Sequence, residues 1–553
     1  MNKLPAIIIL GSSALPTARR IQTLYPGSSV LGLRERVEGA DRYYANFGDT
    51  LRALYRTNTP IIALCAAGIV IRSLATLLGE KGSEPPVLAV AEDASAVVPL
   101  LGGLGGVNRM ARDLAAALDT HAAITTSGEL RFGTCLLDPP PGYQLADLQQ
   151  GKRFVSDLLS GEAVRVEGGA PWLEAAQLPL DDAAQRVIHV DPCARAQRDD
   201  ELLIHPKQVM ALIVQADTQL AEEIADAMHQ ANLAVPALAC LVAQTDLMAE
   251  PLLHEAAAAL EVPVRFIEDI TGLPAALYRS ATVQLLLADR PVDPREIGQP
   301  RGQLTVIGLG PGAADMLIPA ARQALDEAED LLGYETYVTM AGPFRNDQAI
   351  HCTDNREEMQ RARHAFELAA SGRRVVVISS GDPGVFAMAA AVLEALHESS
   401  DPRWQAVDLE ILPGISAALA AAAKAGAPLG HDFCLLSLSD NLKPWAVIEK
   451  RLYHAAAADL VMAFYNPISR ARPWQLGQAL DLVREQRSSD TLVVLGRDIG
   501  RPAEKLTVTT LGELKPEQVD MRTLVIIGSS QTCRFDKKGG DEWVYTPRWY
   551  PAE

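Results

Sequence analysis

Two glycine-rich turns in the second half of this sequence, each directly after an apolar run, are the features best suited to chemistry. Residues 308–312 read Gly-Leu-Gly-Pro-Gly after the run at 304–307, and residues 381–384 read Gly-Asp-Pro-Gly after the run at 375–378. Glycine has no Cβ, so such turns allow bare backbone to approach a ligand closely. Two of them in one half of the chain indicate a cofactor cleft.

The first turn, taken alone, leaves three interpretations open. It suits a Rossmann-type dinucleotide turn, a turn for another nucleotide-like cofactor, or a purely structural turn. Pro311 interrupts the usual dinucleotide pattern, and no convincing acidic residue ends a second strand about twenty positions later. The other strand ends have to decide between these interpretations.

The elements around these turns are those of an α/β protein. In the C-terminal half, strands are predicted at 304–307, 375–378, 408–411, 459–464, 491–495 and 523–527. Most end in Gly, Pro, Asp or Asn. Because ligands of open α/β sheets gather at the carboxyl ends of strands, we expect the chemistry at these ends.

The N-terminal half alternates short apolar runs, at 6–10, 60–64 and 87–90, with helical periodicity at 69–78 and 108–118. That order predicts a parallel α/β sheet. Proline-rich stretches mark further boundaries. We therefore expect a multidomain α/β chain, divided into an N-terminal α/β domain at 1–140, a middle segment at 141–202, a small α/β domain at 203–288, a linker at 289–302, and two lobes at 303–414 and 415–553.

Composition narrows the classes of partner. The formal net charge of −19 argues against a general binder of nucleic acid or of anionic membranes, because both need a basic face.

Seven scattered Cys without a Cys-x-x-Cys pair predict reduced thiols in a cytoplasmic protein. No His/Cys cluster has the spacing of a metal site, so we expect none. No apolar window is long enough to predict a transmembrane helix.

Other strand ends resemble a known family. Four stretches match, in order, the motifs of the tetrapyrrole methylases: 381–386, 412–416, 464–467 and 520–523. Four more resemble the branch that methylates precorrin-3B at C-17 and contracts its ring in cobalamin biosynthesis: 333–337, 430–433, 437–440 and 472–475. The resemblance covers about 303–550.

This resemblance implies a two-lobed α/β methyltransferase with S-adenosylmethionine between its lobes. The methyl group of that cofactor is already activated, so alignment with the nucleophilic carbon at about 3–3.5 Å does most of the work. The cofactor-binding residues that it implies are Gly308, Gly310, Pro311, Gly312, Gly381, Asp382, Pro383, Val385, Phe386, Ser416, Tyr465, Asn466 and Pro467.

Ring contraction also needs a base for a hydroxyl proton. The candidates are His431, Asp432 and Asp440, and histidine suits the task because its ordinary pKa lies near neutrality. Two structural roles stay open as well. His431 also suits a hydrogen bond within a turn, and Asp440 suits a helix cap before Lys443.

The implied substrate, precorrin-3B, is an anionic tetrapyrrole with many carboxylates. Arg and Lys clamp such groups, and aromatic rings pack on a flat macrocycle. The candidates are Lys443, Arg470, Arg472 and Arg497 for the carboxylates and Tyr334 and Tyr337 for the ring, while solvated or core roles stay open for each.

Two points about the reaction stay open, and the resemblance implies two kinds of partner. The macrocycle could already contain cobalt, and the methyl group could go to a different ring position or to RNA or protein. The family tends to form homodimers, and neighbouring cobalamin-pathway enzymes are expected partners.

The N-terminal half carries a second, weaker resemblance. Stretches 65–72, 99–108 and 125–128 resemble the cobalt-precorrin-5A hydrolase family, which opens a lactone. That family carries His in its glycine stretch, whereas Leu104 and Gly105 stand here. Hydrolysis and mere binding of a tetrapyrrole both remain hypotheses. Polar groups left for either role are Arg72, Glu92 and Asp93.

Overall fold

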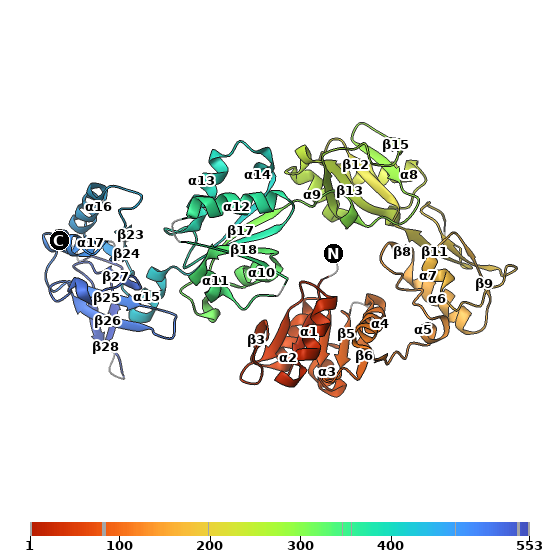
Figure 1. The fold of residues 1–553 in the computed structure, drawn as a ribbon, viewed down its shortest axis with the longest axis horizontal. Coiled ribbons are helices and arrows are strands. Elements are labelled where there is room, and N and C mark those ends of the chain that lie inside the picture. The colour runs from red at the N-terminus through yellow and green to blue at the C-terminus, as the bar shows by residue number, and fades with distance from the viewer. Residues whose placement is uncertain are drawn as a thin grey trace.

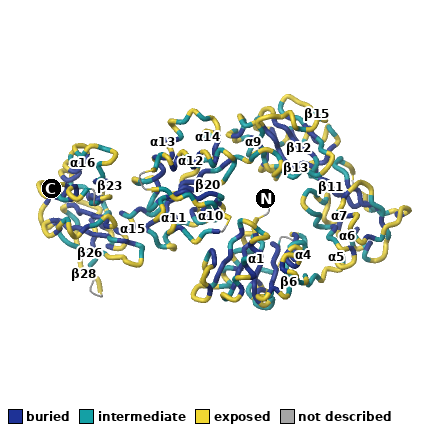
Figure 2. Tube along the Cα trace, in the orientation of Figure 1, coloured by how far each residue is buried: buried dark blue, intermediate teal, exposed yellow. Residues whose placement is uncertain are grey.

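The computed structural model describes residues 3–79, 84–196, 198–345, 347–354, 357–469, 472–538 and 542–550. Over these ranges the chain forms successive α/β units, each around its own sheet and its own buried core (Figures 1 and 2). No helix in the described ranges combines the length and hydrophobicity needed to cross a membrane.

The first unit is a seven-stranded sheet in the order β3-β2-β1-β4-β5-β6-β7. β1 to β5 are parallel, and β6 runs antiparallel to β5. Helices α1 and α4 pack on one face, and α2 and α3 on the other. The bounds are β1 Ala6–Ile9, α1 Leu15–Leu24, β2 Val30–Leu33, β3 Arg42–Tyr44, α2 Phe47–Arg56, β4 Ile61–Leu64, α3 Ala67–Leu74, β5 Val87–Val90, β6 Ala96–Leu101, α4 Val107–Leu118 and β7 His121–Ala122. The next helix, α5 Ser127–Phe132, buries Phe132 in the core of the unit that follows.

Two smaller units follow. The middle unit has the sheet order β8-β11-β10-β9 and the next has β14-β13-β12-β16-β15. Their elements are β8 Tyr143–Leu145, α6 Leu148–Leu159, β9 Val164–Glu167, α7 Pro171–Glu174, β10 Arg186–Val190 and β11 Glu201–Pro206, then β12 Val209–Ile213, α8 Leu220–Gln230, β13 Leu238–Gln244, α9 Pro251–Ala259, β14 Val264–Ile267, β15 Ala276–Arg279 and β16 Val283–Leu287.

The boundary between these two units differs from the expected one. β11 pairs with both β10 and β8, so its residues up to Pro206 belong to the middle sheet. The division therefore falls at 207–208 rather than between 202 and 203. The proline-rich linker at 289–302 is tied to both neighbours, because Phe266 and Gln299 exchange backbone hydrogen bonds and the Asp408 N–H donates to the Gly302 carbonyl at 2.9 Å.

The fourth unit is an all-parallel sheet in the order β19-β18-β20-β17-β21. Helices α12 and α13 cover one face, and α10 and α11 the other. The bounds are β17 Gln303–Gly308, α10 Pro319–Glu327, β18 Asp330–Tyr334, α11 Glu335–Ala341, β19 Ala349–Thr353, α12 Glu358–Ala370, β20 Arg374–Ser379, α13 Met388–Glu398, α14 Pro402–Ala406 and β21 Asp408–Leu412. We call this unit lobe 1.

The last unit, lobe 2, has a mixed sheet in the order β23-β24-β27-β25-β26 and a small three-stranded sheet beside it. Pairing directions make β23, β24 and β25 run the same way, so their carboxyl ends share one edge. The bounds are α15 Ala417–Ala425, β22 Gly426–Ala427, β23 Phe433–Ser437, α16 Trp445–Ala457, β24 Val461–Tyr465, α17 Gln475–Arg484, β25 Leu492–Arg497, β26 Lys505–Thr510, β27 Thr523–Ile527, β28 Cys533–Asp536 and β29 Glu542–Tyr545.

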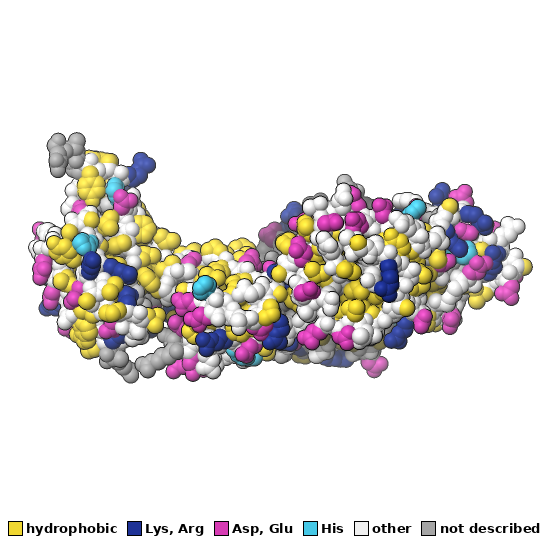
Figure 3. Space-filling view, turned by 90° about the horizontal axis from the view of Figure 1, so that it is seen from above, with side chains coloured by type: hydrophobic (Ala, Val, Ile, Leu, Met, Phe, Trp, Pro, Cys, Tyr) yellow, Lys and Arg dark blue, Asp and Glu magenta, His cyan; other side chains and the backbone are white. Residues whose placement is uncertain are grey.

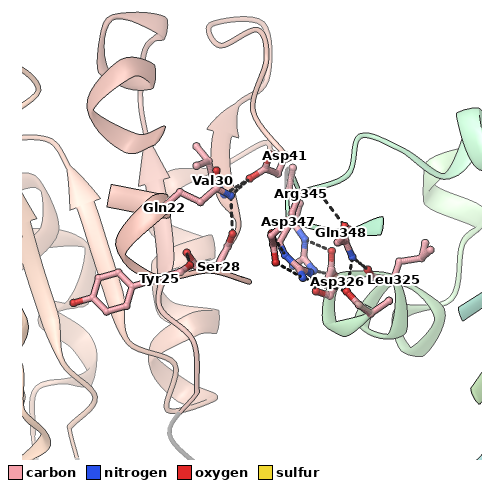
Figure 4. Close-up of polar contacts among 12 residues, drawn as sticks. Gln22, Tyr25, Ser28, Val30, Asp41, Leu325, Asp326, Arg345, Asp347 and Gln348 are labelled. Atoms are coloured by element: carbon pink, nitrogen blue, oxygen red, sulfur yellow. Dashed lines mark hydrogen bonds and ion pairs between the residues drawn. The ribbon is translucent and has the colours of Figure 1, made fainter. Parts of the chain in front are cut away.

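The N-terminal unit returns to lie beside lobe 1, although two units separate them in sequence (Figure 1). Arg42 of β3 donates through Nε to an Asp326 carboxylate oxygen at 2.8 Å. Arg345, which is 6% exposed, donates to the Ala328 carbonyl just after α10 and to the carboxylate of its near neighbour Asp347, both at 3.1 Å. Figure 4 shows this group facing the polar cluster around Asp41 in the N-terminal unit. Burial, and then the charges of Arg322 and Arg345, lower the pKa of Arg42 to about 10.

We expect Arg42→Gln to loosen this contact. A half-buried ion pair of this kind contributes on the order of 1–3 kcal/mol, and its loss leaves Asp326 facing fewer cations. Small-angle scattering of the full chain should show a larger radius of gyration for this variant. Arg34→Gln is the control, because Arg34 is exposed on the same unit. Equal scattering from both variants would contradict a role for this ion pair in docking.

Candidate active site

The carboxyl ends of the parallel strands in lobe 1 meet those of lobe 2. Arg501, just after β25, donates through Nε to the Pro311 carbonyl at 3.2 Å. Within lobe 2, the Ala418 N–H at the start of α15 donates to the Tyr465 hydroxyl at the end of β24 at 2.9 Å. Figure 3 shows the surface hollowed over lobe 1, between lobe 2 on the left and the N-terminal units on the right. The predicted strand-end motifs are therefore gathered along one line of contact.

The glycines of the two turns have different reasons to lack a side chain. A Cβ on Gly308 or on Gly414 would overlap the Gly381 carbonyl oxygen, so bare backbone there allows three strand ends to pack together. Gly310 and Gly381 also exchange backbone hydrogen bonds at 3.1 and 2.9 Å. At Gly308 the reason is thus close packing of backbone, and not the ligand approach expected from the sequence.

Gly381 itself has free space on its Cβ side. Its φ is +65°, and an added Cβ would meet nothing closer than the Cα of Ser416 at 3.8 Å. Asp382 fixes this turn, because its two carboxylate oxygens accept from the N–H groups of Gly384 at 2.8 Å and Gly414 at 3.0 Å. Gly381 is therefore a position where an added Cβ would fit without a clash, in van der Waals contact with the backbone of 415–417.

Two residues of the implied cofactor set have left-handed backbones although they are not glycine. Phe386 has φ 54° and a ring that is 52% exposed, and Asn466 has φ 51°. The Phe386 ring lies 5.4 Å from that of Tyr465, whose pKa is raised mainly by burial. Such conformations cost about 1–3 kcal/mol each and cluster at ligand sites.

The other implied cofactor residues lie around this point. Ser416 caps α15 by accepting from the Leu419 N–H at 3.4 Å, and Asn466 donates to the Ser437 hydroxyl at 3.2 Å. Pro311, Pro383 and Pro467 are buried, whereas Gly312 and Val385 are partly exposed. All of them lie at the strand ends of lobe 1 or lobe 2 that meet here.

Asp440 and Arg472 lie together at the carboxyl end of β23. Gln475 donates to an Asp440 carboxylate oxygen at 3.2 Å, and Arg472 lies 3.8 Å from the same oxygen. Lys443 donates to the Ser439 carbonyl at 3.3 Å, and burial is the main cause that lowers its pKa. Helix α16 begins after Pro444 without a side-chain cap, so the open role of Asp440 as its cap is wrong.

His431 and Asp432 precede β23 and thus lie at its opposite end. The His431 Nδ1 accepts from the Asp432 N–H at 2.7 Å, and its ring packs against Tyr550 at 5.1 Å. The Asp432 side chain is 83% exposed. The structure therefore separates this pair from Asp440, and the hydrogen bond within a turn is the role that it displays for His431.

The remaining substrate candidates are divided. Tyr334 and Tyr337 pack edge to face at 5.3 Å where β18 leads into α11, and burial is the main cause that raises the pKa of Tyr337. Arg497 already donates to the Asp498 and Asp520 carboxylates, both at 2.9 Å. Arg470 lies outside the described residues.

Arg501 was missed by the sequence interpretation. Besides its bond to Pro311, its side chain lies 3.2 Å from where a Cβ on Gly312 would stand, so it packs on the glycine turn of the other lobe. Asp498, whose side chain is 3% exposed, holds it at 3.9 Å. The sequence does contain a signal for Arg501. A Gly-Arg pair at 496–497 directly follows the predicted strand at 491–495, and a second pair stands at 500–501.

Comparison with known proteins decides the family. Residues 303–515 match the family model described as Tetrapyrrole (Corrin/Porphyrin) Methylases. A Sinorhizobium sp protein named Precorrin-3B C(17)-methyltransferase is 50% identical over 249 residues, which are 45% of this chain and 97% of that protein. The chain belongs to the tetrapyrrole methylases.

Other relatives of this tetrapyrrole methylase cover the same half. A Mycobacterium tuberculosis (strain ATCC 25618 / H37Rv) protein named Cobalamin biosynthesis protein CobIJ is 47% identical over 254 residues, 45% of this chain and 49% of that protein. A solved structure titled "Crystal structure of the methyltransferase CobJ" is 51% identical and covers 44% of this chain and 100% of that chain, with a TM-score of 0.42.

The N-terminal half of the tetrapyrrole methylase matches another model. Residues 49–129 match the family described as Cobalamin synthesis G N-terminal. The predictions of a multidomain α/β methyltransferase and of an N-terminal region of cobalamin synthesis type are thus confirmed.

The structure divides the N-terminal motifs between two edges of the first sheet. Cys65 and Glu92 follow β4 and β5 at their carboxyl ends. A Cβ on Gly102, after the antiparallel β6, would instead meet the Pro85 backbone before β5. Asn108 donates to the Thr126 hydroxyl at 3.0 Å, which joins the glycine-rich stretch to 125–128 at that second edge. The sequence motifs therefore form two clusters.

Proposed function

We propose that the C-terminal half methylates precorrin-3B at C-17 with S-adenosylmethionine and contracts its macrocycle during cobalamin biosynthesis. The observation that carries this proposal is 50% identity over 97% of a relative named for that reaction. The meeting of the strand ends of two lobes supports it, because ligands of α/β sheets bind at such ends.

The residues between the lobes fit an adenosyl cofactor. Gly381 offers a backbone unscreened by a side chain, and Phe386 offers an exposed ring for a planar base. When bound, S-adenosylmethionine supplies an activated methyl group. Gly381 and its neighbours would orient that group, and Tyr465 and Ser416 would close the site from lobe 2.

Arg472 and Lys443 suit the carboxylates of an anionic tetrapyrrole. Both cations lie at the carboxyl end of β23, where Arg472 contacts Ser439 and Asp440 and Lys443 donates to the Ser439 carbonyl. Arg binds carboxylates in a bidentate way. Tyr334 and Tyr337 would pack on the macrocycle from lobe 1. Arg497 would reach a substrate carboxylate only by exchanging its bonds to Asp498 and Asp520.

For ring contraction we favour Asp440 as the group that moves the hydroxyl proton, since it shares this edge with Arg472. Asp440→Asn should lower ring contraction about 100-fold, within the range of general acid–base catalysis. His431→Asn should change it by less than about threefold, because this imidazole lies at the other end of β23. Single-turnover assays would measure both. Asp481→Asn is the matched control, because the Asp481 carboxylate is 74% exposed on α17. A larger loss of ring contraction for His431→Asn than for Asp440→Asn would reverse the assignment.

Incubation of the full chain with precorrin-3B and methyl-labelled S-adenosylmethionine tests the main proposal. We expect a methylated, ring-contracted product, and its absence would reject the proposal. Parallel incubation with the cobalt-containing macrocycle decides whether the substrate already holds the metal, and competition with RNA or protein tests those two acceptors.

For the N-terminal half we propose tetrapyrrole binding, with lactone hydrolysis as the competing activity. A truncated variant that begins after residue 300, and so lacks the N-terminal half, distinguishes tetrapyrrole binding from lactone hydrolysis. Unchanged methylation with altered release of the intermediate favours binding, whereas a lactone that stays closed favours hydrolysis. We also propose a cytoplasmic homodimer that works beside other enzymes of the pathway; light scattering of the purified chain tests its oligomeric state.

A further inference from the structure

A cavity of about 330 Å³ lies at the carboxyl edge of the first sheet, far in sequence from the methylase half. It is bounded by the ends of β4 and β5, the start of α3 and the first residues of β6. Its walls are mostly small and apolar, contributed by Ala67, Ala89, Ala91, Ala96 and Val98. Concave sites of this kind, apolar with a few fixed polar groups, are typical of small-molecule binding.

The cavity lies next to the point where the strand order of this sheet reverses. In the order β3-β2-β1-β4-β5, the reversal falls between β1 and β4. The loop after β1 reaches the cavity wall, because the Ser13 hydroxyl donates to the Glu92 carboxylate at 2.9 Å. Ligands of open α/β sheets bind beside such reversals.

The start of α3 opens on this cavity without a cap. The N-cap position is Ala66, which offers no side-chain acceptor, and among the described residues the N–H groups of Ala67 and Gly68 have no acceptor. Arg72 folds back over the same turn, since its Nη1 lies 3.3 Å from where a Cβ on Gly68 would stand. Free N–H groups, the helix dipole and a guanidinium all favour an anion there.

A second, independent feature is the thiol of Cys65. The residue is 7% exposed, lines the cavity, and makes no side-chain hydrogen bond in the part of the chain that the structure describes. A buried free thiol behaves as a small hydrophobe with a weak donor, so Cys65 extends the apolar wall of the cavity. Burial, and then the charge of Glu92, raise the pKa of Cys65 to about 11, so the group is a neutral thiol at neutral pH.

We propose that this cavity binds a small carboxylate-bearing molecule with an apolar body and a hydrogen-bond donor of its own. The carboxylate accepts from the N–H groups at the start of α3 and from Arg72. The body fills the alanine-lined space above Cys65. The donor of the ligand reaches Glu92, whose carboxylate is fixed by Ser13 at the opposite wall. Because Glu92 would repel a bare anion, a ligand that carries both kinds of group is selected.

The site itself is independent of methyl transfer, although the choice of a pyrrole as probe rests on the proposed function. Porphobilinogen combines a pyrrole N–H, an ammonium group and two carboxylates. Isothermal titration of the full chain should give a Kd on the order of 0.1 mM for a ligand of this size. Its dimethyl ester should bind at least about threefold more weakly, since the carboxylates are masked.

Variants locate the binding. Ala67→Leu fills the cavity and should weaken binding at least about tenfold, whereas Ala53→Leu adds the same volume at an exposed position of α2 and should leave it unchanged. Arg72→Gln and Glu92→Gln, both at exposed positions, should each weaken porphobilinogen binding about three- to tenfold. If Ala67→Leu fails to fold, these two variants still test whether the ligand binds in this cavity. No binding at 5 mM (about fifty times the expected Kd), or binding unaltered in the Arg72 and Glu92 variants, overturns the proposal. S-adenosylhomocysteine titrated in the same samples reports separately on the methylase half.

Discussion

Gly381→Ala will weaken the binding of S-adenosylhomocysteine by about 10- to 100-fold. The added Cβ meets no protein atom closer than 3.8 Å, so within the protein the substitution is spatially harmless. The methyl group would instead lie against the backbone of 415–417, at the junction of the lobes where we place the cofactor. A tenfold loss corresponds to about 1.4 kcal/mol, which the exclusion of one ligand contact readily supplies.

Backbone strain has to be separated from this effect. Gly381 has φ +65°, and alanine in the left-handed region costs roughly 1 kcal/mol of folding free energy. Gly133→Ala is the matched control, because Gly133 has φ +73° and open space around its Cβ but lies in the N-terminal half. Both variants should lose similar thermal stability, and only Gly381→Ala should lose affinity in calorimetry. Equal affinity for both would remove Gly381 from the cofactor site.

The comparison with Gly308 shows what the sequence reveals and what it hides. The pattern of apolar runs and glycine turns predicts the strands of lobe 1 well, because buried parallel strands are continuous apolar stretches. It does not reveal which glycine faces a ligand and which allows backbones to touch. Gly308 and Gly414 are needed for the second reason, and this depends on strand ends brought together only by the fold.

Distance along the chain misleads in a similar way at β23. His431 and Asp440 are close in sequence, but the five residues of Phe433–Ser437 lie between them. A strand rises about 3.3 Å per residue, so the two ends of β23 that these residues flank are roughly 13 Å apart. A turn in place of this strand would have brought them together, and no local pattern distinguished the two cases.

The middle unit was the hardest to predict for a different reason. Its strand β11 ends in His205 and Pro206, which are unfavourable signals for a central strand. Tertiary contacts override them: the His205 ring bonds the Asp191 carbonyl at 2.8 Å, and burial is the main cause that lowers its pKa. Polar residues satisfied in this way cannot be recognised before their partners are known.

Arg501→Ala will lower kcat/KM for methyl transfer about 30- to 100-fold, which is roughly 2–3 kcal/mol of transition-state stabilisation. The guanidinium reaches across from lobe 2 to the Pro311 carbonyl and packs on Gly312. Its terminal N–H groups make no hydrogen bond to the described residues and remain available to a carboxylate between the lobes. Removing it should both loosen the contact of the two lobes and delete a charge-assisted bond of about 1.5–3 kcal/mol.

Binding and kinetic measurements on Arg501→Ala distinguish whether the carboxylate bound by Arg501 belongs to the cofactor or to the substrate. Weaker binding of S-adenosylhomocysteine assigns the guanidinium to the cofactor, whereas a raised KM for the tetrapyrrole alone assigns it to the substrate. Arg501→Lys keeps the charge but loses the planar donor set, so it should restore only part of the activity. Arg534→Ala is the control, since Arg534 is about half exposed and, among the described residues, pairs only with Glu542 at 3.4 Å, away from the contact of the lobes. If Arg501→Ala matched this control in kcat, KM and cofactor affinity, the bridge between Arg501 and Pro311 would be a packing contact without a part in the reaction.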